Sequence, residues 1–387
     1  MFHHSWIEIS KENLIHNIKA HYKFLDKGVK LSPVVKSNAY GHGMILVSKV
    51  LDKMKEIGFL SVVNLEEAII LRKNKIKKAI LVLSYYGVGG SEKEFIEQIK
   101  FAIQNNISLM VYDLTQIKLL NEIAGKLKKN IKIHIKVETG MARVGVPYEQ
   151  ALDFIQKINK LDNVMIEGLA SHFATTEESN QYFAKFQLNN FKELIKKLDE
   201  LNINIPIKHM AASAAITLSK ENHFNAVRLG IAMYGLWPSK ENKKVINKKY
   251  PQFNLKPVLS WKTKLFQIKK LKANMPVGYG CTYRTTKSIT MGLIPVGYFE
   301  GLDRKFSNKG YALIKGQKCP IIGAICMNIA MLDISKVKGA KVGEDVTLIG
   351  KSGKKEIKAD DLALEINTIN YELVTRLNPE IQRKLIR

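Results

Sequence analysis

A regular alternation of short apolar runs and longer amphipathic stretches constrains the fold of this chain more than any other feature. The apolar runs are rich in Val, Ile and Leu, which is typical of buried parallel strands. Eight such β/α units in series predict a closed β/α barrel of the TIM type. The predicted strands cover residues 29–36, 59–64, 79–85, 107–113, 131–138, 164–172, 205–213 and 226–234. Helical spacing of apolar residues predicts helices at residues 65–74, 90–105, 115–129, 148–161 and 180–201.

The C-terminal part of the chain has a different pattern. A polar linker, ENKKVINKKYPQFNLKP, precedes short apolar runs separated by Gly, Pro and Asn, as in a small, mainly antiparallel β-domain. A last helix is predicted at residues 360–377. We therefore expect an α/β protein, with the barrel in residues 10–245 and the β-domain in residues 246–387. An opening strand within residues 1–9 is free to pair with either domain.

Size and composition limit the classes of protein that the chain can represent. Its 387 residues suit two domains, and 46% apolar with 25% charged residues is ordinary for a globular protein. No apolar run reaches the roughly 18 residues of a membrane span, and the N-terminus lacks an apolar signal-peptide core. Three cysteines, Cys281, Cys319 and Cys326, favour a reducing cytoplasm over a disulfide framework. We expect a cytoplasmic protein with no membrane partner.

The net charge of +26 invites a nucleic-acid interpretation. The lysines, however, are spread along the whole chain in short pieces such as KNKIKK and KKNIK, and no nucleic-acid-binding motif accompanies them. A solvated basic surface explains them better, so no nucleic-acid partner is expected. The charge can still steer small anionic ligands toward the protein.

Polar side chains fall where the predicted barrel strands end. Lys36, Asn64, Lys136, His172, Ser213 and Arg228 all lie at or just past the end of an apolar run. The fifth strand, residues 131–138, alternates Ile and Val with Lys132, His134, Lys136 and Glu138, so one face is polar and is expected to point into the barrel. Barrel enzymes carry their chemistry at these strand ends. The sequence therefore predicts one site at the C-terminal mouth of the barrel.

The first of these strand ends carries the most specific pattern, VVKSNAYGHG. A lysine that ends an apolar strand often reaches solvent, which is the ordinary alternative. Here it is followed by two glycines that let backbone approach a ligand closely and by Tyr40, whose hydroxyl can donate to an anion. The stretch resembles the cofactor lysine motif of the alanine racemase family, and this resemblance extends from Trp6 to about Leu377. It implies that Lys36 forms a Schiff base with pyridoxal 5'-phosphate.

Racemisation of an amino acid needs an electron sink and a base on each face of the Cα atom. The resemblance implies that Lys36 is one base and that Tyr279, in PVGYG, is the other. Without the resemblance, Tyr279 reads as an aromatic residue of a turn. A tyrosine acts as a base only where positive surroundings lower its pKa.

The same resemblance implies the remaining contacts of the site. Arg228, in VRLGIAMYG, faces the pyridine nitrogen, and because a permanent cation cannot readily share a proton, it keeps the sink weak. His172 lies against the ring. The phosphate is held by backbone of Gly230 and Ile231 and by hydroxyls of Tyr40, Ser213 and Tyr371.

Substrate contacts are implied in the same way. Arg143, in KVETGMAR, contacts the cofactor phenol oxygen and the substrate carboxylate, and Lys136 of the same motif is a candidate for carbamylation. Met327, in ICMN, helps to bind substrate from the β-domain. Ala212, Ala324 and Asn328 depart from the usual family residues, which bears on substrate breadth. No metal is expected.

The resemblance implies interconversion of L-alanine and D-alanine by a two-base mechanism on a pyridoxal phosphate aldimine, supplying D-alanine for peptidoglycan. It also implies a homodimer with shared active sites, in which Lys36 of one chain meets Tyr279 of the other. Two alternatives stay open. One is a broader-specificity or serine racemase of the same family. The other is a non-catalytic pyridoxal phosphate carrier, although such carriers end after the barrel.

Overall fold

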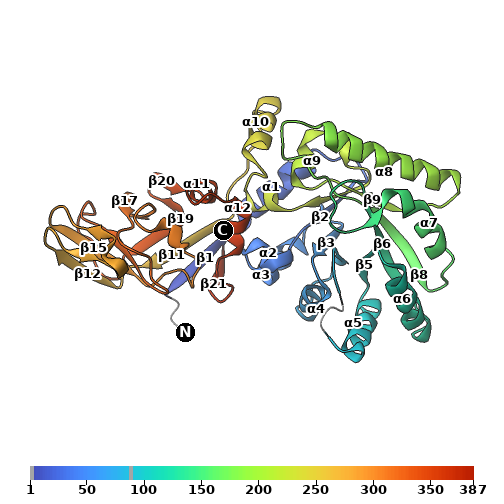
Figure 1. Ribbon diagram of the computed structural model, residues 1–387, viewed down its shortest axis with the longest axis horizontal. Coiled ribbons are helices and arrows are strands. Elements are labelled where there is room, and N and C mark those ends of the chain that lie inside the picture. Colours follow the sequence, from blue (N-terminus) through green and yellow to red (C-terminus); the bar gives the residue numbers. More distant parts are fainter. Residues whose placement is uncertain (1–3, 87–89) are drawn as a thin grey trace.

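The computed structural model describes residues 4–86 and 90–387 of the chain. Figure 1 shows two bodies side by side, a barrel of strands surrounded by helices and an elongated β-domain. The parallel strands of the barrel follow the order β2-β10-β9-β8-β6-β5-β4-β3, with short strand β7 (Val146–Pro147) attached to β6. Their bounds are β2 Lys30–Pro33, β3 Phe59–Val62, β4 Ala79–Val82, β5 Ile107–Val111, β6 Ile131–Glu138, β8 Val164–Ala170, β9 Ile207–His209 and β10 Ala226–Leu229.

The barrel closes between its first two strands. Parallel bridges join Leu31 to Ile57 and Val34 to Ser61. The backbone N–H of Val35 donates a hydrogen bond to the carbonyl of Ser61 at 2.8 Å. The predicted eight-stranded β/α barrel is therefore confirmed. Most strands end earlier than expected because the last residues of each apolar run already belong to the loops at the mouth.

The five helices predicted around the barrel are confirmed, and the structure contains further helices that the sequence pattern did not predict. The helices are α1 Lys11–Tyr22, α2 Lys36–Tyr40, α3 Met44–Leu51, α4 Leu65–Lys73, α5 Glu92–Gln104, α6 Leu114–Lys126, α7 Tyr148–Ile158, α8 Tyr182–Glu200, α9 Ser213–Leu218, α10 Lys240–Lys249, α11 Ala359–Glu365 and α12 Asn370–Thr375. Helices α1, α2, α3 and α9 had no predicted counterpart. The supposed polar linker contains α10, which Ser239 caps at its N-terminus. The single helix predicted at residues 360–377 is two short helices, because Asn367 between them has a φ of +57°.

The β-domain is mainly antiparallel, as predicted. Its largest sheet has the order β17-β16-β19-β11-β1-β21 with β20 attached to β19, beside the smaller sheets β12-β15-β18 and β13-β14. The strands are β11 Leu259–Lys264, β12 Gln267–Leu271, β13 Pro276–Val277, β14 Tyr283–Arg284, β15 Ile289–Ile294, β16 Tyr311–Ile314, β17 Gln317–Pro320, β18 Ala330–Asp333, β19 Asp345–Ser352 and β20 Lys355–Ile357.

Both ends of the chain join the β-domain. Strand β1 (Ser5–Ser10) pairs antiparallel with β11, and its other edge pairs in parallel with β21 (Gln382–Ile386), a strand that the sequence pattern did not predict. Ile7 and Ile9 are fully buried in a core that is continuous with that of the barrel. The two domains therefore share apolar packing, which fixes how the last helices approach the barrel mouth.

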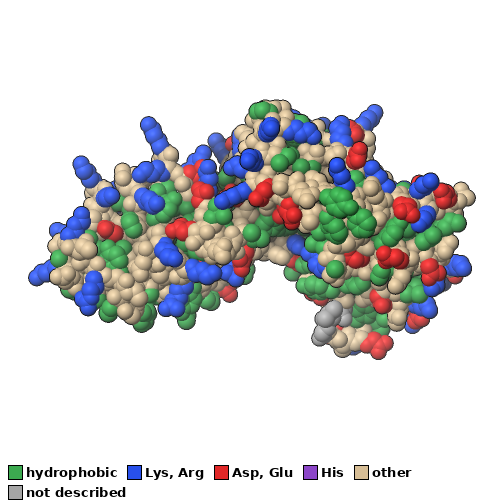
Figure 2. Space-filling view, turned by 45° about the horizontal axis from the view of Figure 1, so that its top comes forward, with side chains coloured by type: hydrophobic (Ala, Val, Ile, Leu, Met, Phe, Trp, Pro, Cys, Tyr) green, Lys and Arg blue, Asp and Glu red, His purple; other side chains and the backbone are tan. Residues whose placement is uncertain are grey.

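The surface carries the basic residues in a scattered pattern. Figure 2 shows Lys and Arg side chains over both domains of the visible face, with Asp and Glu between them on the barrel. This distribution agrees with a solvated basic surface. Among the residues that the structure describes, no helix is long and apolar enough to cross a membrane.

Candidate active site

Lys36 is followed by a left-handed backbone turn. The four residues that follow Lys36, Ser37 to Tyr40, all have φ angles of 53–54°, and Gly41 follows with a φ of +81°. A left-handed conformation costs about 1–2 kcal/mol for each residue other than glycine. The turn is therefore held by its surroundings, which include hydrogen bonds to Asn38: its carbonyl accepts from Gly43 N–H and its side-chain oxygen from Met44 N–H, both at 2.9 Å.

Glu67 provides a further anchor for this turn. Its carboxylate accepts hydrogen bonds from the backbone N–H groups of Ser37 at 2.6 Å and Val63 at 2.9 Å. Burial lowers the pKa of Lys36, the Arg143 guanidinium lowers it further, and the Glu67 carboxylate partly raises it again. Lys36 is thus more readily neutral than an exposed lysine, as a Schiff-base lysine must be.

A cluster of hydroxyl groups lies at one side of the cavity. The hydroxyl oxygen of Ser213 accepts hydrogen bonds from the backbone N–H groups of Gly230 at 2.9 Å and Ala232 at 3.4 Å. A Cβ atom on Gly230 would lie 3.0 Å from the hydroxyl of Tyr40, so glycine keeps this cradle open. Tyr371 joins the cluster from α12, with its ring centroid 6.2 Å from that of Tyr40. Hydroxyl donors around an open cradle suit a phosphate group.

Arg228 lies one residue before the end of β10 and is buried at the base of the cavity. Its guanidinium donates to the carbonyls of Ser171 at 2.7 Å, Met210 at 3.0 Å and His209 at 3.2 Å, and to Nδ1 of His172 at 3.1 Å. A shorter hydrogen bond joins it to Nδ1 of His209. Burial and then Arg143 lower its pKa to about 10, so the guanidinium remains charged at neutral pH.

Positive charge is in excess at the site. Within residues 4–86 and 90–387, Lys36, Lys136, Arg143 and Arg228 form no ion pair with a carboxylate within 4 Å. Burial, followed by Arg228, holds the pKa of Lys136 well below its usual range. The Glu138 carboxylate is engaged by backbone N–H groups of the loop that carries Arg143, including that of Gly140 at 2.6 Å. Such a cavity attracts an anionic ligand.

One cavity of about 500 Å³ collects most of the predicted site residues. It is lined by Lys36, Tyr40, Lys136, Arg143, His172, Ser213, Arg228, Gly230, Ile231 and Tyr371, and also by Ala212. Tyr279 and Met327 are not among its residues. They line a separate, more open hollow of about 540 Å³ on the β-domain, where their exposed fractions are 75% and 54%.

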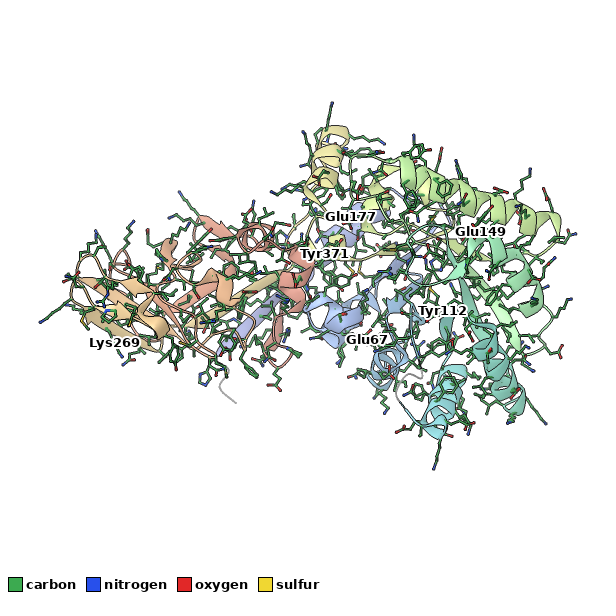
Figure 3. All side chains as sticks on the ribbon, in the orientation of Figure 1. Glu67, Tyr112, Glu149, Glu177, Lys269 and Tyr371 are labelled. Atoms are coloured by element: carbon green, nitrogen blue, oxygen red, sulfur yellow. The ribbon has the colours of Figure 1, made fainter. Side chains whose placement is uncertain are left out.

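Two acidic residues of the site had no counterpart in the sequence prediction. Glu177 lines the cavity and accepts a hydrogen bond from the hydroxyl of Tyr371 at 2.9 Å, and Figure 3 shows the two residues together where barrel and β-domain meet. Burial raises the pKa of Glu177. Glu67, also labelled in Figure 3, follows the N-cap of α4, so its position in the sequence indicated only a helix start.

The fold and the site together are those of a β/α-barrel protein with a lysine, hydroxyl donors and excess positive charge at the barrel mouth, a set of groups that suits a phosphate-bearing cofactor. Residues 9–238 match the alanine racemase N-terminal domain and residues 258–385 the alanine racemase C-terminal domain. The chain is 37% identical over 384 residues to alanine racemase of Methanococcus maripaludis, with 98% of each chain covered. It therefore belongs to the alanine racemase family, whose members depend on pyridoxal phosphate.

Solved structures agree with this assignment. Alanine racemase of Clostridium difficile 630 matches with a TM-score of 0.91 and 34% identity, covering 100% of this chain and 96% of that chain. A structure of alanine racemase from the same organism in complex with cycloserine matches with a TM-score of 0.88 and 33% identity, over the same shares of the two chains. A small molecule is thus bound by a protein that closely resembles this one.

Proposed function

We propose that this protein interconverts L-alanine and D-alanine, with Lys36 and Tyr279 as the two bases. The observation that carries the proposal is the position of Lys36, which lines the cavity and has a lowered pKa. The other cations of this cavity have no carboxylate partner within 4 Å among the described residues. Bound pyridoxal phosphate supplies the electron sink that acidifies the Cα–H bond. The chain supplies the binding contacts and the two proton carriers.

The cofactor contacts follow from the cavity lining. Hydroxyls of Tyr40, Ser213 and Tyr371 would hold the phosphate next to Gly230. Arg228 would hold the ring side of the cofactor, and its guanidinium, which keeps its protons, would not readily protonate the ring nitrogen. This favours return of the proton to Cα over side reactions.

Arg143 and Lys136 hold the opposite side of the cavity. The guanidinium of Arg143 binds the carboxylate of the substrate. A neutral lysine amine can add to carbon dioxide and release a proton, and Lys136 has the lowered pKa that this reaction needs. The carbamate then carries a negative charge that can pair with Arg143 and offset part of the positive excess.

Tyr279 reaches a substrate only in a homodimer. It lies in the β-domain hollow with Met327, away from the cavity that contains Lys36 in the same chain. Exposed apolar side chains, including Tyr298 and Ile329, line this hollow, as is typical of a subunit interface. In a two-fold dimer, each hollow covers the barrel mouth of the partner, and each site combines Lys36 of one chain with Tyr279 of the other.

We place the enzyme in the cytoplasm, where it supplies D-alanine for peptidoglycan. The test is a chiral assay of the purified protein over the L-amino acids, with L-serine as the main competitor. Formation of D-alanine well above every other product supports the proposal, and a preference for another amino acid contradicts it. Borohydride reduction followed by peptide mass analysis must place the cofactor on Lys36, and Lys36→Ala must lose both the label and the activity.

A further inference from the structure

A chain of hydrogen bonds leads from Arg228 into the interior of the barrel, below the cavity. The guanidinium bonds Nδ1 of His209, Nε2 of His209 lies 2.9 Å from Nδ1 of His134, and Nε2 of His134 lies 3.2 Å from a carboxylate oxygen of Glu167. The four residues come from strands β10, β9, β6 and β8. Of these, only Arg228 lines the cavity, and both histidines are at most 1% exposed.

The residues at the two ends of this series of hydrogen bonds, Arg228 and Glu167, determine which ring nitrogens of the two histidines carry protons. A guanidinium only donates and a carboxylate only accepts, so Nδ1 of His209 must accept and its Nε2 must carry a proton. The same argument gives His134 a proton on Nε2, which it donates to Glu167. A second proton on either ring would make two N–H groups face each other. Burial, the largest cause, lowers the pKa of both rings, which keeps them neutral.

Glu167 is held as an acceptor. Its carboxylate accepts from the hydroxyl of Ser108 at 2.5 Å and lies 3.4 Å from the ammonium of Lys132. Burial alone would raise the pKa of Glu167, but the hydrogen bonds from His134 and Ser108 outweigh it and lower this pKa to about 2. The carboxylate is therefore ionised at any pH at which the enzyme works.

The backbone of β8 is shaped for this contact. The register between β6 and β8 shifts after Ile133, so that Ile133 pairs with Ile166 and His134 with Gly168, and Glu167 is the extra residue of a β-bulge. A bulge re-aims a side chain. A Cβ atom on Gly168 would lie 2.1 Å from Nδ1 of His134, so only glycine leaves room for the ring. The bulge directs Glu167 toward His134, and Gly168 leaves space for the imidazole ring.

We propose that Glu167 is a positioning residue for Arg228, because it sets the tautomers of His134 and His209 and so makes His209 present a lone pair to the guanidinium. This inference rests on the proposed role of Arg228 beside the cofactor ring. Without the acceptor at Glu167, either ring can take the other tautomer. An Nδ1–H on His209 would then repel the guanidinium and displace it.

Three variants distinguish the effect of the acceptor oxygen of Glu167 from the effect of the charges of Glu167 and Lys132. Glu167→Leu removes the acceptor at similar size. Glu167→Gln keeps an acceptor oxygen without the charge. Lys132→Met removes the neighbouring ammonium and leaves the hydrogen-bond chain unchanged.

Two measurements report the result. Imidazole ¹⁵N NMR on the protein without cofactor reports the protonated nitrogen of each ring directly. The ratio of transamination to racemisation in the loaded enzyme reports the placement of Arg228.

We expect protonated Nε2 on both rings in the wild type, in Glu167→Gln and in Lys132→Met. In Glu167→Leu we expect a second tautomer and an increase in the transamination ratio of about tenfold. A wild-type spectrum with Nδ1–H on either ring overturns the proposal even if no variant folds. A folded Glu167→Leu protein with wild-type tautomers and product ratio also overturns it. A wild type that lacks alanine racemisation contradicts the proposed function and leaves the tautomer result to be judged separately.

Discussion

The carboxylate of Glu67 accepts a hydrogen bond of 2.6 Å from the backbone N–H of Ser37, the residue directly after Lys36. This contact joins the start of helix α4 to the left-handed turn that follows Lys36. It also places a negative charge near the Lys36 amine, opposite in sign to the nearby Arg143 guanidinium. The two groups shift the pKa of Lys36 in opposite directions, so replacing either one should move this pKa in a known direction.

The rate at which the apoprotein captures pyridoxal phosphate is expected to rise with pH as the Lys36 amine loses its proton. Arg143 lowers the pKa of Lys36, so Arg143→Met should move the midpoint of this profile to higher pH, and Arg143→Lys should move it less. Glu67 raises the same pKa, so Glu67→Gln should move the midpoint to lower pH. Stopped-flow absorbance gives both midpoints. Shifts of the same sign in Arg143→Met and Glu67→Gln would contradict this account.

The contact between the lysine turn and helix α12 predicts a stability difference between two glycines. Gly41 has a φ of +81°, and a Cβ atom there would lie 2.0 Å from the carbonyl oxygen of Val374. Gly28 has a φ of +93° with nothing within 4 Å of such an atom. Gly28→Ala should therefore lose only about 1–2 kcal/mol of unfolding free energy through backbone strain. Gly41→Ala should lose clearly more, as measured by urea unfolding, and equal losses would show that the clash relaxes without cost.

Sharing of the two bases between subunits predicts recovery of activity on mixing. Lys36→Ala and Tyr279→Phe homodimers should each be nearly inactive, because every site lacks one base. In a hybrid dimer, one site has both defects and the other has both bases. After random exchange half of the dimers are hybrids, so activity should return to roughly a quarter of the wild-type level per site. If both bases belonged to one chain, mixing would restore nothing.

Glu177 is expected to weaken cofactor binding. Its carboxylate lies beside the hydroxyl cluster proposed to hold the phosphate and accepts the proton of Tyr371 that a phosphate oxygen would otherwise receive. Glu177→Gln should tighten pyridoxal phosphate binding several-fold, since it removes about 1 kcal/mol of repulsion between like charges. Tyr371→Phe should weaken binding instead by about tenfold, because a hydrogen bond to a charged group is lost. Equilibrium dialysis gives both constants, and weaker binding by Glu177→Gln would argue against a phosphate at this position.

Local pattern was sufficient where a residue's neighbours in the chain decide its structure. The eight barrel strands, the strand-end position of Lys36 and the antiparallel C-terminal domain were all predictable, because burial and side-chain period are written in consecutive residues. Two of the errors fall where distant partners override that pattern. Strand β21, with the sequence QRKLI, has no strand-like alternation and forms because it pairs with β1, more than 370 residues earlier. The left-handed turn after Lys36 needs Glu67 from another β/α unit.

The sequence by itself therefore determined the barrel, the place of Lys36 at its mouth and the side chains available at the strand ends. Tertiary structure decided how those side chains are charged and aimed. The pKa of Lys36 depends on burial and on Arg143 and Glu67, and the tautomer of His209 depends on Glu167 through His134. Electrostatic and hydrogen-bond energies depend on distances and directions in space, and residues from four different strands acquire those distances only when the barrel closes.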